Sequence, residues 1–496
     1  MMRASEGSKL GGIFTVAPGV DVQGELTLSG AETSLYLHHK DSLDEYFIPR
    51  QYVHGVLHDL TKVSLIQCAM AGGGTAGRGG ERYHFARIFP HFVIQGDSHI
   101  TPDQVTITSV HFAVDDAAVI FYDFDAFGLL TDARPFIGTI TEANSKVAKR
   151  KISTGPVPEI LYFTGKRRIF AADTVIGKIY ASHNPQLTTW GGPEGVGISN
   201  TIFVTIEFRE PVIFEQSILC TRTLLRFLEI LAGRPQNLLQ LDLIVESEHH
   251  DHVELQVYWC LHPKREPFSE EKKLHPGDMI MDPARHPECF SAVLTSWLDR
   301  QDEWHDARAR FSSCFAKQNL YDVDRLIGAA NMFDILPSQA VPPDVPLSKE
   351  LEVARETSRM AFESLPPSPE RDSVLSSLGR LGKASLKQKV RQRARIVIDA
   401  VGDRYAELVM VADEAVNCRN YYVHGGKARF AYDNHFNSVD FFIDALEFIF
   451  AASDLIEAGW DARGWSKNFT SMSHRFARFR VNYAECLREL KSLLSP

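Results

Sequence analysis

Hydrophobic and polar positions alternate in short runs over the first half of the chain, and turn-forming residues separate these runs. This spacing is typical of strands in an antiparallel sheet, where successive side chains point to opposite faces. The sequence therefore predicts a β-rich N-terminal region that folds as a sandwich or a barrel. The runs that carry this prediction are residues 12–16, 24–30, 33–39, 104–114, 117–124, 159–165 and 200–208.

Two longer elements follow towards the end of this region. Residues 215–233 repeat apolar positions every three or four residues and end at a glycine, which predicts a helix and its stop. Residues 238–261 hold two alternating runs around a polar, histidine-rich centre, which predicts a hairpin. Three prolines in residues 275–288 mark the expected end of the region, and we place the first domain at residues 1–283.

From Cys289 onward the apolar positions recur with helical spacing, so most of the remaining chain is expected to be helical. A proline-rich connector occupies residues 337–346. We therefore expect an α+β multidomain protein, in which the β-rich domain is followed by an all-α bundle at residues 284–496. The predicted helices are residues 289–316, 321–336, 347–365, 385–401, 403–426, 435–459 and 476–494.

Composition narrows the class of protein. The 496 residues carry a formal net charge of −10, so a nucleic acid would have to bind at a local basic patch. The seven cysteines are scattered and include no C-x-x-C pair, which argues against a disulfide framework or a zinc ribbon and favours a reducing compartment. The sequence shows no signal peptide and no apolar run long enough to span a membrane. We expect a cytoplasmic protein.

The stretch NCRNYYVHGG, residues 417–426, holds the strongest candidate chemistry. Asn420 and His424 are four residues apart and share a helix face, whereas Arg419 lies roughly 140° from His424 on an ideal helix. A straight helix would therefore not stack Arg419 on His424. The long arginine side chain, or a last turn loosened before Gly425, could still join them, and the site could also be shared between two chains.

These residue types fit the cleavage of a phosphodiester by a ribose 2′-hydroxyl, which needs a base, an acid and a cation for the developing charge. Histidine titrates near neutral pH, and arginine holds phosphate through two donors. One copy of the motif supplies one histidine, so two copies across a twofold axis would complete the set, and no metal is required. Alternatively, His424 only complements the helix dipole, and Arg419 pairs with Glu414 or Asp413.

Arg419, Asn420 and His424 resemble, position by position, the HEPN ribonuclease motif, R-x(4–6)-H with a polar residue after the arginine. The whole chain is similar to the ApeA-like proteins, which pair a β-rich N-terminal domain with a C-terminal HEPN domain. The segment FLEILAGRP at residues 227–235 resembles the end of their first domain. This resemblance covers most of the chain.

The resemblance implies a metal-independent endoribonuclease without a cofactor, active as a homodimer through the C-terminal helices, in bacterial antiphage defence by abortive infection. Arg419 would bind the scissile phosphate, Asn420 would orient it, and His424 would be the general acid or base. The first domain would be a sensor or regulator, and a phage-derived trigger is its expected partner. Two alternatives stay open: a non-catalytic HEPN module that binds RNA or a protein, and a ligand sensor with a helical dimerisation scaffold.

A local reversal of charge precedes the motif. Residues 380–395 include seven cations and no acid. The nearest acidic residues on either side are Asp372 and Asp399. We interpret this run as a candidate RNA contact, although a solvated helix face or a patch that pairs with acids of the first domain explains it equally well. The candidate RNA-binding residues are Lys387, Lys389, Arg391, Arg393 and Arg395.

Three weaker signals remain. The run ESEHHDHVE at residues 246–254 offers metal ligands, but alternation in a hairpin would divide them between two faces, and we expect no metal site. The glycine-rich residues 71–82 lack the G-K-[ST] ending of a phosphate loop, which leaves a flexible loop as the expectation. The basic residues 145–151 and 165–168 are explained equally well by the solubility of loops or by RNA.

Overall fold

The computed structural model describes the chain except for residues 1–5, 41–51, 79–80, 190–194, 247–251, 263–264, 266–272, 433–435 and 496. The described part of the chain forms two compact units. The first comprises residues 1–231, 236–269 and 281–295, and the second comprises residues 232–235, 270–280 and 296–496. The domain boundary expected at residues 283 and 284 stays a prediction.

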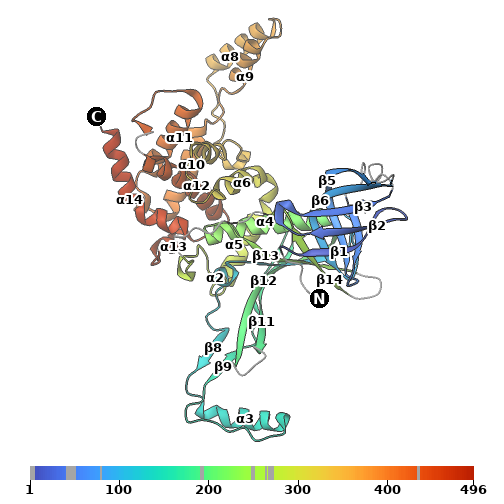
Figure 1. Cartoon of the computed structure of the whole chain (residues 1–496). Coiled ribbons are helices and arrows are strands. Elements are labelled where there is room, and N and C mark those ends of the chain that lie inside the picture. Colours follow the sequence, from blue (N-terminus) through green and yellow to red (C-terminus); the bar gives the residue numbers. More distant parts are fainter. Residues whose placement is uncertain are drawn as a thin grey trace. The chain divides into compact units, whose positions relative to one another are not determined.

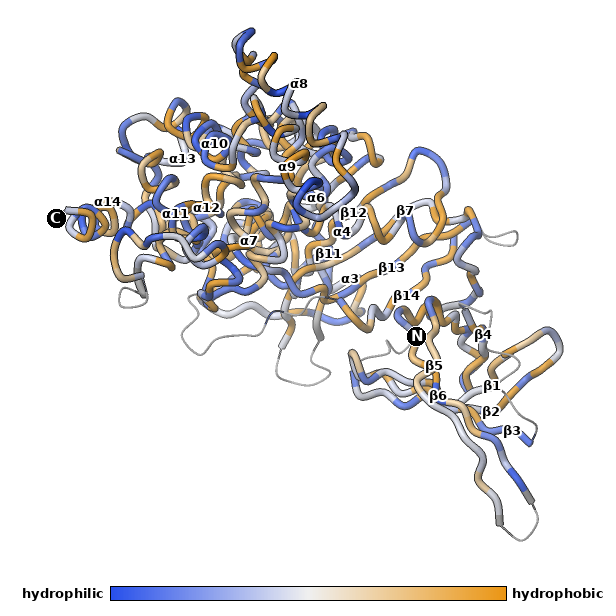
Figure 2. The backbone as a smooth tube through the Cα atoms, turned by 90° about the horizontal axis from the view of Figure 1, so that it is seen from above, coloured by the Kyte–Doolittle hydropathy of each residue, from blue (hydrophilic) through white to orange (hydrophobic). Residues whose placement is uncertain are grey.

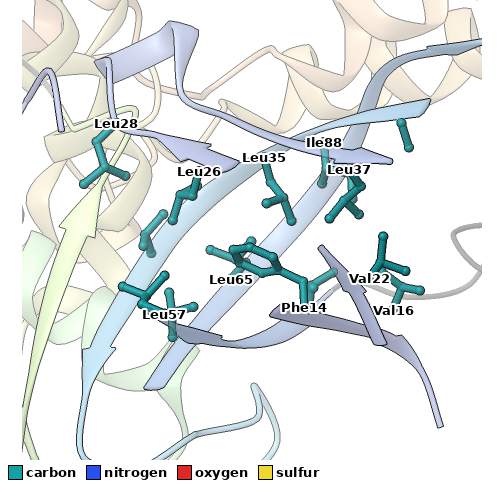
Figure 3. Close-up of a cluster of buried hydrophobic side chains, with 14 of the residues drawn as sticks. Phe14, Val16, Val22, Leu26, Leu28, Leu35, Leu37, Leu57, Leu65 and Ile88 are labelled. Carbon is teal, nitrogen blue, oxygen red and sulfur yellow. The ribbon is translucent and has the colours of Figure 1, made fainter. Parts of the chain in front are cut away.

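The first unit contains a six-stranded antiparallel barrel, so the predicted β-rich fold is confirmed (Figure 1). It closes because β6 pairs with β3 on one edge and with β5 on the other. Apolar side chains such as Phe14, Leu35 and Val63 fill its interior, as Figure 3 shows in part. The barrel strands are β1 (Lys9–Ala17), β2 (Val20–Thr27), β3 (Ser34–His39), β4 (Tyr52–Leu57), β5 (Lys62–Arg78) and β6 (Glu81–Gly96).

The sheet continues beyond the barrel because the far half of β6 also pairs with β14. From there the order is β14, β13, β7, β12, β11 and β10, and β13 with β14 forms the predicted hairpin. Figure 2 shows hydrophobic positions along these strands. Their bounds are β7 (Ile107–Val114), β10 (Arg168–Thr174), β11 (Gly177–Thr189), β12 (Val196–Val212), β13 (Leu238–Val245) and β14 (Val253–Trp259).

Helices and a two-stranded sheet complete the first unit. The helix predicted at residues 215–233 is α4 (Phe214–Ala232), and Gly233 follows it with a φ of 69°. The remaining elements are α2 (Ala117–Ile120), β8 (Phe127–Leu130), α3 (Arg134–Ala148) and β9 (Ile160–Phe163). The basic residues 145–151 thus begin on the last turn of α3.

Two predictions about this unit are wrong. Residues 117–124 were expected to form a strand, but they begin with the short helix α2, whose residues Ala117 and Ile120 are buried on one side. The glycine-rich residues 71–82 were expected to form a flexible loop, yet residues 71–78 and 81–82 belong to a long ribbon of β5 and β6, in which Gly74 pairs with Phe85. Residues 79–80 lie outside the described part of the chain. Glycine weakens a strand but does not prevent pairing when a complete partner strand lies beside it.

The second unit is helical, as predicted (Figure 1). Helix α12 contacts α6, α7, α10, α11 and α14, which explains why it is apolar on nearly all sides. Helix α5 (Pro287–Asp299) begins in the first unit and ends in the second. The other helices of the second unit are α6 (Gln301–Phe315), α7 (Val323–Asn331), α8 (Lys349–Glu363), α9 (Pro369–Gly379), α10 (Leu386–Val401), α11 (Leu408–His424), α12 (Phe436–Glu457), α13 (Ala462–Lys467) and α14 (Arg475–Leu494).

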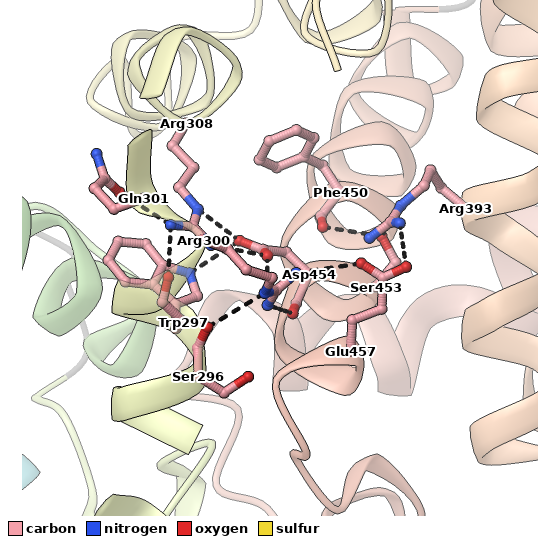
Figure 4. A network of polar contacts seen from close by, with 10 residues as sticks. All are labelled: Ser296, Trp297, Arg300, Gln301, Arg308, Arg393, Phe450, Ser453, Asp454 and Glu457. Carbon is pink, nitrogen blue, oxygen red and sulfur yellow. Dashed lines mark hydrogen bonds and ion pairs between the residues drawn. The ribbon is translucent and has the colours of Figure 1, made fainter. Parts of the chain in front are cut away.

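Buried ion pairs connect α12 to neighbouring helices. Asp454 accepts hydrogen bonds from Arg308 Nε at 2.9 Å and from Trp297 Nε1 at 2.9 Å (Figure 4). About two turns before it along α12, Glu447 accepts from Arg325 Nε at 2.8 Å, and both of these side chains are 0% exposed. A buried charge is tolerated only when it is paired and hydrogen-bonded, so these contacts fix the positions of α6 and α7 on α12.

Candidate functional site

Helix α11 carries the R-N-x-x-x-H motif on its last turns. Its inner face buries apolar residues that include Leu408, Val411, Ala415 and Cys418, and this face seats the helix in the bundle. The helix ends at His424, and Gly425 adopts a left-handed conformation with a φ of 66° while its N–H bonds Tyr421 O. Glycine adopts this conformation without steric cost, so the predicted glycine stop is confirmed.

Arg419 and His424 meet within one chain. Arg419 Nη1 lies 3.3 Å from His424 Nε2 and donates to Asn420 Oδ1 at 3.0 Å. Helix α11 stays regular as far as His424, so the length of the arginine side chain makes the contact and no loosened turn is needed. Because a guanidinium can only donate, the contact requires a lone pair on Nε2, which is the atom that can accept a proton from a substrate.

Asn331 is a member of the site that sequence reasoning missed. It is the last residue of α7, and its Oδ1 accepts a hydrogen bond of 2.8 Å from Arg419 Nη2. The two residues are 88 positions apart, and no local pattern singles out Asn331. Only the packing of α7 against α11 brings them together.

Within the described residues, the hydrogen-bond partners of Arg419 are Asn331, Asn420 and His424, and none of them carries a negative charge. No carboxylate lies within ion-pairing distance of its guanidinium there, and its buried Nε has no hydrogen-bond partner. The partners considered in the alternative interpretation are engaged elsewhere, because Asp413 pairs with Arg391 and Glu414 pairs with Arg429. A half-buried arginine without a counter-charge is suited to binding an anion from solution.

The motif faces solvent at its C-terminal end. Val423, His424, Gly425, Gly426 and Lys427 are all exposed, whereas Arg419 and Asn420 are half-buried behind them. An extended polyanion or a second protein chain therefore has access to His424.

The cations of α10 differ in their contacts, and three of them bond other residues of the same unit. Arg393 is buried, with 1% of its side chain exposed, and it donates to Ser453 Oγ and Glu457 Oε1 (Figure 4). Lys389 is 17% exposed and donates to Asp334 O. Arg391 makes two bonds of 2.7 Å to Asp413. Arg393 thus has a structural role in the bundle, and we leave it out of the proposed RNA contacts.

Lys387 and Arg395 lie on the more open side of α10, and Arg395 is exposed. The short connection at residues 402–407 makes α10 and α11 antiparallel neighbours, and the Arg391–Asp413 pair sets their register. One turn from this pair, Lys387 is level with residue 417, close to the motif. Arg395 is level with residue 409, which is about 15 Å along the helix from Arg419.

The other sequence signals add no site. Among the described residues, no three His, Cys, Asp or Glu side chains are grouped so that they could hold a metal. The centre of the histidine-rich run, residues 247–251, lies outside the described part of the chain. In the same described part, no helix combines the length and the hydropathy that a membrane span needs.

Comparison with known proteins assigns the chain to a family. The model of the Apea-like HEPN domain matches residues 327–463, which include the second half of α7, all of α10 and α11, and the whole motif. The helical unit thus contains a HEPN domain of the class found in nuclease-like antiphage effectors. The model of ApeA N-terminal domain 1 matches residues 10–297, more than half of the chain, and the chain therefore belongs to the ApeA family. Searches of curated proteins and of solved structures found no match.

Proposed function

We propose that the chain is a metal-independent endoribonuclease that cleaves RNA by attack of a ribose 2′-hydroxyl on the adjacent phosphodiester. The observation that carries this proposal is Arg419, a cation held by neutral groups and placed 3.3 Å from an exposed histidine. A phosphate would supply the missing counter-charge at the point where an acid or base is available. RNA cleavage by the purified chain in EDTA, with the ends mapped, tests the proposal.

In this mechanism the motif supplies the groups that bind the phosphate and one group that transfers a proton. Arg419 binds the scissile phosphate and stabilises the charge that develops on its oxygens. Asn420 accepts from Arg419 through Oδ1, which leaves its amide N–H groups to donate to the phosphate. A histidine takes the 2′-hydroxyl proton, the 2′-oxygen bonds to phosphorus, and the bond to the 5′-oxygen breaks. An acid protonates that oxygen, so the products are a 2′,3′-cyclic phosphate and a 5′-hydroxyl.

The proton balance favours a site made by two chains. The motif supplies His424 as its one histidine, yet cleavage uses a base and an acid in the same step. The end of α11 is exposed, so a second copy of this segment can approach it. We infer a homodimer through the C-terminal helices in which an isologous interface faces the two motifs towards each other. The contact between Arg419 and His424 lies within one chain, but it adds no second acid or base, so a second histidine is still required.

Mixing chains tests the shared site. Adding excess His424→Ala chains to the wild type should lower the activity per wild-type chain, because each heterodimer then holds one histidine instead of two. The measurement is the initial rate of RNA cleavage as a function of the mixing ratio, with sedimentation of the same mixtures to count dimers. Activity that stays proportional to the amount of wild-type chain, or a monomer at micromolar concentration, would contradict the composite site.

Charge reversal on α10 tests the path of the RNA. Lys387→Glu should weaken RNA binding and flatten its dependence on salt, because fewer counterions are released when the complex forms. Arg395→Glu is the matched comparison: it changes the same charge on the same helix, but it lies about 15 Å from the motif along α11, so it should weaken RNA binding less. Dissociation constants at several salt concentrations measure both. If the two variants bind RNA equally well, the register between α10 and α11 does not guide the RNA.

We also infer that the β-rich first unit regulates the nuclease in antiphage defence by abortive infection, with a phage-derived trigger as its partner. Membership of the ApeA family supports this inference, since the N-terminal match covers residues 10–297. Purified chain with and without lysate from phage-infected cells provides the test, read as RNA cleavage. Equal cleavage in both conditions would argue for a constitutive enzyme.

A further inference from the structure

Asn331 connects the motif to a rigid part of the bundle. Its Oδ1 accepts from Arg419 Nη2 at 2.8 Å, the shortest of the three contacts between the guanidinium and neighbouring side chains. Asn420 and His424 lie on the same helix as Arg419, so they move with it. Asn331 belongs to α7, and among the contacts of the described residues it joins the guanidinium to a different helix.

Helix α7 is held firmly in place. Asp322 caps its N-terminus by accepting from Arg325 N at 2.6 Å. Arg325 pairs with Glu447 on α12 and also donates to Gln318 O and Leu320 O, and its side chain is fully buried. Leu326 and the alanines that precede Asn331 are buried as well. The backbone at Asn331 is therefore anchored, and its amide offers the guanidinium a fixed acceptor.

The neutrality of this acceptor matters. Elsewhere in the bundle, buried arginines such as Arg308 and Arg325 are held by carboxylates, which cancel their charge. An aspartate at position 331 would form a stronger bond to Arg419, but it would place a negative charge beside the phosphate. An asparagine orients the guanidinium and leaves its positive charge uncancelled.

We propose that Asn331 is a positioning residue for RNA cleavage: it fixes the guanidinium of Arg419 through a neutral hydrogen bond and keeps its charge available to the scissile phosphate. This inference rests on the proposed ribonuclease function. It assigns two separable properties to one side chain, the hydrogen-bond acceptor that sets geometry and the absence of charge that preserves affinity.

Two substitutions separate these properties. Asn331→Ala removes the acceptor and should lower kcat about 10- to 100-fold with a small change in KM, because the arginine stays charged but is misplaced in the transition state. Asn331→Asp keeps an acceptor and adds a charge. It should raise KM and flatten the salt dependence of RNA binding by the equivalent of about one phosphate contact. A purely structural role would lower the melting temperature of both variants without dividing the effects between kcat and KM.

Asn319→Asp is the matched control, because it introduces the same charge before the opposite end of α7 and should leave kcat and KM unchanged. Wild type and Arg419→Ala are measured first. If the wild type does not cleave RNA, or if Arg419→Ala is equally active, the proposed function itself fails. If those two behave as expected while Asn331→Ala and Asn331→Asp both match the wild type, the role of Asn331 is overturned and the proposed function stands. Should Asn331→Ala fail to fold, Asn331→Asp decides the question through KM and the salt dependence.

Discussion

Replacing His424 with alanine should lower RNA cleavage by at least ~100-fold, the usual scale for a positioned acid or base. Arg419→Ala should cause a loss of similar size, since the guanidinium is the group placed to hold the scissile phosphate. His424 is exposed at the end of α11, whereas Arg419 is half-buried and makes polar contacts, so neither substitution removes a residue of the apolar core and the fold should survive. Initial rates on a defined RNA, with melting temperatures of each variant, provide the measurement.

Two control substitutions test whether the loss of activity is specific to the motif. His305→Ala removes an exposed histidine from α6, and Arg429→Ala removes an exposed arginine from the segment after the motif. Both should keep activity close to that of the wild type. Cleavage should also persist in EDTA and leave 2′,3′-cyclic phosphate ends. Activity that disappears on chelation and survives in His424→Ala would show that the motif does not catalyse the reaction.

The parts of the fold that could be predicted are those that local patterns determine. Apolar spacing of three or four residues identified α4 and most helices of the bundle, and the glycines after His424 marked the end of α11. The short helices α9 and α13 were not predicted, and residues 289–316 form two helices, α5 and α6, instead of one. Alternation identified β1, β2, β3 and the hairpin of β13 and β14. Alternation alone did not distinguish a sandwich from a barrel. That distinction depends on the pairing of β5 with β6, which closes the circle.

Where the prediction was wrong, tertiary contacts override a local preference. The glycines at residues 71–77 suggested a loop, but the backbone of β6 supplies a full set of pairing partners, from Arg87 to Arg82. Residues 117–124 are apolar enough for a buried strand. They form the turn of α2 instead, where Ile120 and Phe121 fill the core, and no strand beside them offers hydrogen bonds within the described residues.

The site shows the same division. Arg419, Asn420 and His424 could be chosen from sequence because they are close together on one helix, and the structure brings them into contact. Asn331 could not be chosen, since its partner is 88 residues away. The cations of α10 looked alike in sequence, but Arg393 points to Glu457, 64 residues later, and becomes part of the core. A helix periodicity reveals which cations share a face, not which face is buried.

The structure of the bundle leads to a second large expected effect, which concerns stability. Asp454→Ala should lower the free energy of unfolding of the helical unit by about 3–5 kcal/mol, because it leaves a buried arginine without its counter-charge. Arg308 is 2% exposed and donates to both carboxylate oxygens of Asp454, at 2.9 and 3.0 Å. Burial already lowers the pKa of Arg308, which shows how unfavourable its charge would be without the pair. Urea unfolding followed by tryptophan fluorescence reports directly, since Trp297 donates to the same carboxylate.

This loss in the free energy of unfolding should come from the unpaired buried charge of Arg308 and not from the loss of one hydrogen bond. Removing both partners together, with Arg308→Met and Asp454→Leu, should therefore recover most of the stability that Asp454→Ala loses, because position 308 then carries no buried charge without its partner. Asp302→Ala on the exposed first turn of α6 is the control for a lost carboxylate, and it should cost less than about 1 kcal/mol. A loss in Asp454→Ala no larger than that in Asp302→Ala would contradict the role of the buried ion pair. A double substitution as unstable as the single one would contradict it as well, since the loss would then come from packing around Trp297 and not from the charge of Arg308.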